Sequence, residues 1–93
     1  MAEGHKAEKM REYIIRGVDS YLCEHSDTLG FCHVDAVILS GDLRSAKILV
    51  VGDNTVAGKK LENLLNSSKN GIVKKLKEIF STKFLPKITF IGS

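Results

Sequence analysis

Apolar residues in the first quarter of the chain recur at the spacing of one helix face. Positions three, four and seven apart share a face, and the intervening charged residues fall largely elsewhere. The polar segment 24–28, followed by Leu29 and Gly30, is expected to end this helix, and residues 1–6 are expected to form a short polar tail. The apolar positions that define the face are Met10, Ile14, Val18, Tyr21 and Leu22.

Two runs rich in β-branched and aliphatic residues follow, at 31–39 and 46–51. Such runs, bounded by polar turn residues, are typical of strands. The segment between them begins Ser-Gly-Asp-Leu at 40–43, which has the composition of a tight turn. Two strands joined by so short a loop most simply pair as an antiparallel hairpin.

A pair of helices is predicted in the second half of the chain. Gly52 and Asp53 close the second strand, and Asn54 or Thr55 is suited to cap a helix. Turn-forming residues at 66–71 then interrupt the periodicity, which resumes at Ile72. The apolar positions of the two helices are Leu61, Leu64 and Leu65, then Ile72, Val73, Leu76, Ile79 and Phe80.

The last predicted element is a strand at 88–91, which follows the chain-breaking Pro86. The order α-β-β-α-α-β predicts an α+β fold in which helices pack on one face of a three-stranded sheet. Two helices separated by a small polar break and followed by a strand also form the core of a K-homology (KH) domain, where the break lies close to the RNA backbone. With 93 residues and no repeat or linker, we expect one domain spanning 1–93.

Composition is ordinary for a soluble globular protein, with 43% hydrophobic and 27% charged residues. No apolar run approaches the roughly 18 residues of a membrane span, and the first residues lack the apolar core of a secretory signal. Cys23 and Cys32 are too few for a disulfide scaffold and are expected to stay reduced. These features favour a cytoplasmic location.

Charge is distributed unevenly along the chain. Residues 1–46 hold five basic and eight acidic side chains, a net charge of −3, whereas residues 47–93 hold nine and three, a net charge of +6. This asymmetry favours a polyanionic partner for the second half. The alternative is a solvated lysine surface that binds nothing in particular.

Three segments resemble the ribosome-binding factor A family. Residues 34–50 are similar to its hairpin, of which the Ser-Gly-Asp-Leu-Arg turn at 40–44 is the most specific part. Residues 65–76 resemble its pair of helices, with Lys69-Asn70-Gly71 where the family usually has Ala-x-Gly at the break, and residues 84–90 resemble its closing strand. The resemblance covers about two thirds of the chain, in the family's order.

This resemblance implies a KH domain of the second type without catalytic activity. It also implies binding to the small (30S) ribosomal subunit and to 16S rRNA during late maturation. The same resemblance implies that the protein supports 5′-end processing of that RNA and growth at low temperature. The expected protein is a monomer without a membrane partner or a small-molecule substrate.

The candidate RNA-binding residues lie around the interhelical break and on the second helix of the pair. Lysines that neutralise phosphates release counterions, and a glycine allows close approach of a backbone. The predicted contacts are Lys69, Asn70, Gly71, Lys74, Lys75, Lys77 and Lys83.

The turn residues Asp42 and Arg44 are assigned a structural role, because a short turn needs local hydrogen bonds more than it needs a ligand. The alternative for Arg44 is RNA contact.

No catalytic or metal-binding pattern is visible. The histidines and cysteines have none of the usual zinc spacings, and no nucleophile-elbow or phosphate-loop motif occurs, so no metal, cofactor or enzymatic activity is expected. The histidines and cysteines that lack such spacing are His5, Cys23, His25, Cys32 and His33. Two alternatives to the ribosomal interpretation are a small basic protein-interaction module and an enzyme of ferredoxin-like appearance.

Overall fold

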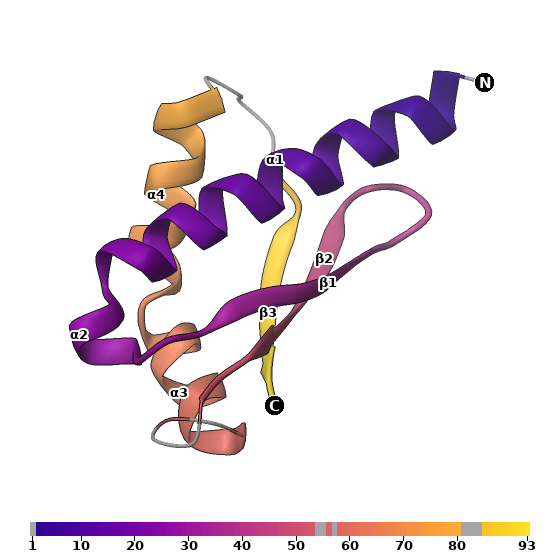
Figure 1. Ribbon diagram of the computed structural model, residues 1–93. Coiled ribbons are helices and arrows are strands. Elements are labelled where there is room, and N and C mark those ends of the chain that lie inside the picture. The colour runs from indigo at the N-terminus through magenta and orange to yellow at the C-terminus, as the bar shows by residue number, and fades with distance from the viewer. Residues whose placement is uncertain (1, 54–55, 57, 81–84) are drawn as a thin grey trace.

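The computed structural model describes residues 2–53, 56, 58–80 and 85–93, which form an α+β fold (Figure 1). Apart from the short helix α2, the order of elements is the predicted α-β-β-α-α-β. The elements are α1 (Ala2–Glu24), α2 (Ser26–Leu29), β1 (His33–Leu39), β2 (Ser45–Val51), α3 (Gly58–Ser67), α4 (Lys69–Phe80) and β3 (Lys87–Gly92).

The first residues of α1 and β1 differ from the sequence prediction, whereas β2 and β3 differ from it by one residue at their ends. Helix α1 begins at Ala2, inside the segment 1–6 that was expected to be a polar tail. Strand β1 begins at His33 rather than at Phe31, because the backbone N–H of Phe31 is bonded to the carboxylate of Asp53 (3.2 Å) instead of to a strand. The Phe31 side chain is 80% exposed.

The sheet is mixed, with β2 between the other two strands. β1 and β2 form the predicted antiparallel hairpin, with a bulge between Val34 and Ala36. β2 and β3 are parallel, with Ile48 opposite Phe90. A parallel pair needs a crossover connection, and α3 and α4 provide it.

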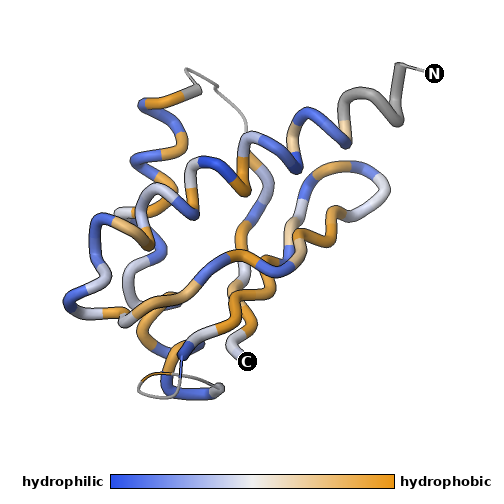
Figure 2. Tube along the Cα trace, viewed as in Figure 1, coloured by the Kyte–Doolittle hydropathy of each residue, from blue (hydrophilic) through white to orange (hydrophobic). Residues whose placement is uncertain are grey.

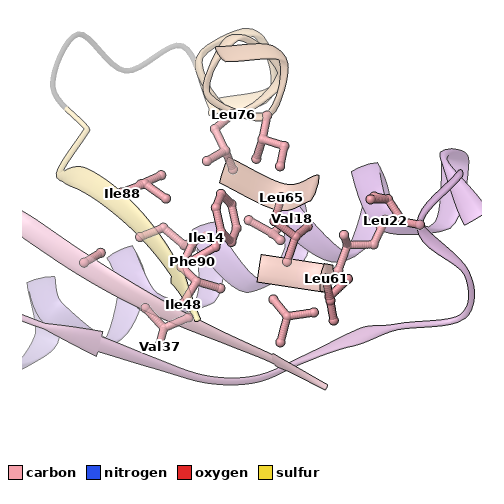
Figure 3. Packing of buried hydrophobic residues seen from close by; sticks show 14 residues of the cluster. Ile14, Val18, Leu22, Val37, Ile48, Leu61, Leu65, Leu76, Ile88 and Phe90 are labelled. Carbon is pink, nitrogen blue, oxygen red and sulfur yellow. The ribbon is translucent and has the colours of Figure 1, made fainter. Parts of the chain in front are cut away.

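The helices cover one face of the sheet, as predicted, and the core lies between the layers (Figure 1). Side chains along a strand alternate between faces, so every second residue of β2 and β3 points at the helices. Figure 2 shows hydrophobic positions interspersed with hydrophilic ones along the helices, as expected for helices with one buried face. Figure 3 shows the resulting cluster, which includes Ile14, Val18, Leu22, Val37, Ile48, Leu61, Leu65, Leu76, Ile88 and Phe90. Burial of each large side chain contributes about 1.5–3 kcal/mol.

Helix side chains bind the backbone at both edges of the sheet. Along β1, Arg11 of α1 donates to the Val37 carbonyl (3.1 Å), and Asp19 accepts from the Val34 N–H (2.9 Å) beside the bulge. Along β3, the Asn66 amide of α3 donates to the Phe90 carbonyl and accepts from its N–H, both at 3.3 Å. These contacts satisfy strand groups that would otherwise be open to another chain.

Candidate nucleic-acid interface

The break between α3 and α4 is shorter than predicted. The sequence placed it at residues 66–71, but α3 continues to Ser67 and α4 begins at Lys69. Ser68 alone separates them, and its carbonyl already accepts the N–H of Ile72 (3.1 Å). The prediction failed because the Asn66 side chain bonds to β3 instead of competing with its own helix backbone. Lys69, Asn70 and Gly71 therefore form the first turn of α4.

Gly71 faces α1 at close range. A Cβ atom built on it would lie 3.3 Å from the hydroxyl oxygen of Tyr21. The close approach that a glycine permits is therefore used here by a side chain of α1. The packing of α1 against α4 therefore explains why position 71 is a glycine.

A shallow hollow of about 480 Å³ lies along the exposed side of α4. Three ammonium groups and one carboxylate surround it, so its charge is net positive. We call it the lysine hollow; it is lined by Lys69, Asn70, Val73, Lys74, Lys77 and Glu78. The structure thus brings together four of the seven predicted RNA-binding residues.

Lys75 is held differently from these lysines. Its ammonium forms an ion pair and hydrogen bond with the carboxylate of Glu24, and its side chain is 20% exposed. The pKa of Glu24 lies below its ordinary value, mainly because of this hydrogen bond. Lys75 therefore links α4 to α1 and already has an anionic partner. The remaining predicted residue, Lys83, lies outside the described residues.

A second hollow, of about 420 Å³, lies on the other side of Lys74 between α1 and α4. The rings of Tyr21 and His25 stack beside it, with centroids 3.9 Å apart and planes inclined by 16°. We call it the aromatic hollow; it is lined by Tyr21, Glu24, His25, Gly71, Lys74, Lys75, Glu78 and Ile79. Sequence reasoning missed this pair, although two ring residues four positions apart at the end of the first helix were the available signal.

The carboxylate of Asp42 organises the hairpin turn. It accepts a hydrogen bond from the Ser40 hydroxyl (2.7 Å) and another from the backbone N–H of Arg44 (3.1 Å). The Arg44 side chain lies 3.8 Å from the same carboxylate and is 87% exposed. Between them Leu43 has φ 60°, in the left-handed region that non-glycine residues seldom occupy. The two hydrogen bonds to Asp42 come from a hydroxyl group and a backbone N–H, and not from the Arg44 side chain. These contacts support a structural role for Asp42 in the turn.

Replacing Asp42 with asparagine should change stability in a pH-dependent way. The Ser40 hydroxyl, with the Arg44 N–H, holds the pKa of Asp42 below its ordinary value. The carboxylate therefore stabilises the fold above its unfolded pKa of about 3.9, and this advantage is lost as pH falls through the lower folded pKa. Urea unfolding of wild type and Asp42→Asn should show wild type more stable at pH 7 and the difference reduced near pH 3. A difference that stays constant over that range would contradict this assignment.

Among the described residues, no group of three or more His, Cys, Asp or Glu side chains is close enough together to hold a metal ion. Cys23 and Cys32 are free thiols, and the pKa of Cys32 is raised mainly by burial.

No helix in the described part of the chain is both long and apolar enough to cross a membrane.

Comparison with known proteins identifies the fold. No protein-family model matches the chain, and no curated protein matches it in sequence. A solved structure of ribosome-binding factor A from Thermus thermophilus superimposes with a TM-score of 0.79 at 19% sequence identity. The match covers 90% of this chain and 91% of that one.

The chain has the fold of ribosome-binding factor A. The family resemblance seen in the sequence is thereby confirmed at the level of the fold, over nearly the whole of both chains. The α+β class, the order of elements and the three-stranded mixed sheet agree with that comparison.

Proposed function

We propose that this protein binds the small ribosomal subunit through 16S rRNA during late maturation and supports 5′-end processing, particularly at low temperature. The single observation that carries the proposal is the superposition on ribosome-binding factor A over 90% of the chain. In this proposal the protein acts in the cytoplasm as a monomeric, non-catalytic factor.

The lysine hollow supports RNA as the ligand. Lys69, Lys74 and Lys77 line one stretch of α4, so an RNA backbone laid along the helix would meet several ammonium groups in succession. Each phosphate neutralised in this way releases condensed counterions, which makes the affinity strong at low salt and steeply salt-dependent. The first turn of α4 adds backbone N–H groups and the positive end of the helix dipole at Lys69 and Asn70.

The opposite face of the sheet favours a second candidate function, protein docking. Ile38 is 53% exposed and Ile91 is 36% exposed, and the open face of β2 lies between their strands. Ile91 lies opposite the partly exposed Leu49 of β2, so apolar side chains open to solvent extend across two strands of this face, a feature of interaction surfaces. Binding through this face would depend little on salt, whereas binding through the lysine hollow would depend on it steeply.

The maturation role is tested by deleting the gene in the organism that carries it. We expect slower growth in the cold and accumulation of 16S rRNA with an unprocessed 5′ end, both restored by the wild-type gene. Primer extension on total RNA measures the unprocessed fraction. Normal growth and fully processed 16S rRNA in the deletion strain would overturn the proposal.

A further inference from the structure

The aromatic hollow combines a fixed ring platform with a cation. Tyr21 and His25 stack on each other at its wall, and Lys74 lines both this hollow and the lysine hollow. The two hollows therefore adjoin along α4. A polyanion on the lysine hollow would have its next unit beside the rings.

The His25 ring is held in place before any ligand arrives. Its Nδ1 lies 2.9 Å from the backbone carbonyl oxygen of Tyr21. Because a carbonyl oxygen only accepts, Nδ1 carries the hydrogen in this contact. The Tyr21 ring packs in turn against α4, where a Cβ at Gly71 would lie 3.3 Å from its hydroxyl oxygen. A platform ordered in advance loses little conformational entropy when a ligand stacks on it.

The formal charges that line the aromatic hollow cancel, because Glu24 and Glu78 offset Lys74 and Lys75. The net positive charge lies on the adjoining lysine hollow, where a phosphate would bind. The carboxylate of Glu24 is paired with Lys75, so these two groups largely neutralise each other. Lys74 is exposed and Glu78 lies beside it, while the apolar wall is completed by Ile79, which is 48% exposed. An aromatic platform, an apolar wall and a lysine are the contacts that a nucleotide of single-stranded RNA uses.

We propose that the aromatic hollow is a base-stacking subsite that takes one unpaired nucleobase of an RNA strand whose phosphates lie on the lysine hollow. This inference rests on the proposed function and narrows it to single-stranded RNA, because a base must be unpaired to stack on a side chain. His25 supplies the stacking surface, and Lys74 contacts the phosphate that joins the two hollows.

The test compares two probes on the wild-type protein and two variants. The probes are a single-stranded RNA of five CA repeats and an oligonucleotide of the same length and charge that lacks all bases. Base stacking gives the first probe an advantage of about tenfold in affinity on wild type. His25→Ala should lose that advantage and keep the salt dependence, whereas His25→Phe should retain most of it.

Phe31→Ala is the matched control, because Phe31 is an 80%-exposed aromatic residue that lies outside the lining of the aromatic hollow. It should bind both probes as wild type does. Equal binding of the two probes by wild type would overturn the subsite while leaving salt-dependent RNA binding intact. Absence of salt-dependent binding to either probe would overturn RNA binding through α4 and the subsite together. The probe comparison on wild type needs no variant, so it remains decisive if His25→Ala fails to fold.

Discussion

Changing Lys69, Lys74 and Lys77 together to glutamate should lower the affinity for single-stranded RNA by at least about a hundredfold at 0.1 M salt. Each lysine that neutralises a phosphate contributes about 0.7 to the slope of log affinity against log salt concentration. Loss of three contacts therefore reduces that slope by about two. The three side chains line one hollow on α4, so one RNA strand can meet them together. Fluorescence anisotropy over a salt series measures both quantities.

A second triple variant with the same change in net charge provides the control. Lys47, Lys60 and Lys87 are exposed on β2, α3 and β3, away from the lysine hollow. Their change to glutamate should reduce the affinity much less and leave the slope nearly unchanged. Equal losses in the two triple variants would mean that RNA responds to net charge alone, which would contradict a site on α4.

Replacing Gly92 with alanine should cost about 3 kcal/mol of unfolding free energy, near the upper end of typical overpacking penalties. A Cβ on Gly92 would lie 2.2 Å from the carbonyl oxygen of Gly58 and 2.7 Å from the backbone nitrogen of Glu62. Both atoms belong to the backbone of α3, so relief requires movement of the helix away from β3. The expected fall in Tm is more than about 10 °C for a chain of this size.

Gly41→Ala is the matched control, because a Cβ at this hairpin position would have no atom within 4 Å. Its stability should stay within about 0.5 kcal/mol of wild type, as for most surface substitutions. Urea unfolding of both variants, with the denaturant slope compared, gives the two values. A Gly92→Ala variant as stable as Gly41→Ala would contradict the contact between the end of β3 and the start of α3.

The sequence predicted those parts of the fold whose signal is periodic. Ile14, Val18 and Leu22 were placed on one helix face by spacing alone, and all three are buried. The hairpin followed from two apolar runs and a short polar loop. The break between α3 and α4 was misplaced because turn-forming residues are equally compatible with helix ends, and the bond from Asn66 to β3 is a long-range contact that local propensity does not contain.

The candidate site was predictable only as a set of residue types. The sequence predicted Lys69, Lys74 and Lys77 as RNA contacts, and the structure brings these three together at one hollow. The ion pair of Lys75 with Glu24 and the packing of Tyr21 against Gly71 join residues about 50 positions apart. Contacts over that distance depend on how α1 lies across α4, which no local pattern reports.

The most direct test of the ribosomal role is co-sedimentation of the purified protein with isolated small and large subunits at low and high salt. We expect binding to small subunits and not to large ones, with the bound fraction falling as salt rises, because the contact proposed on α4 is electrostatic. Equal binding to both subunits, or no binding to small subunits at either salt concentration, would contradict the account.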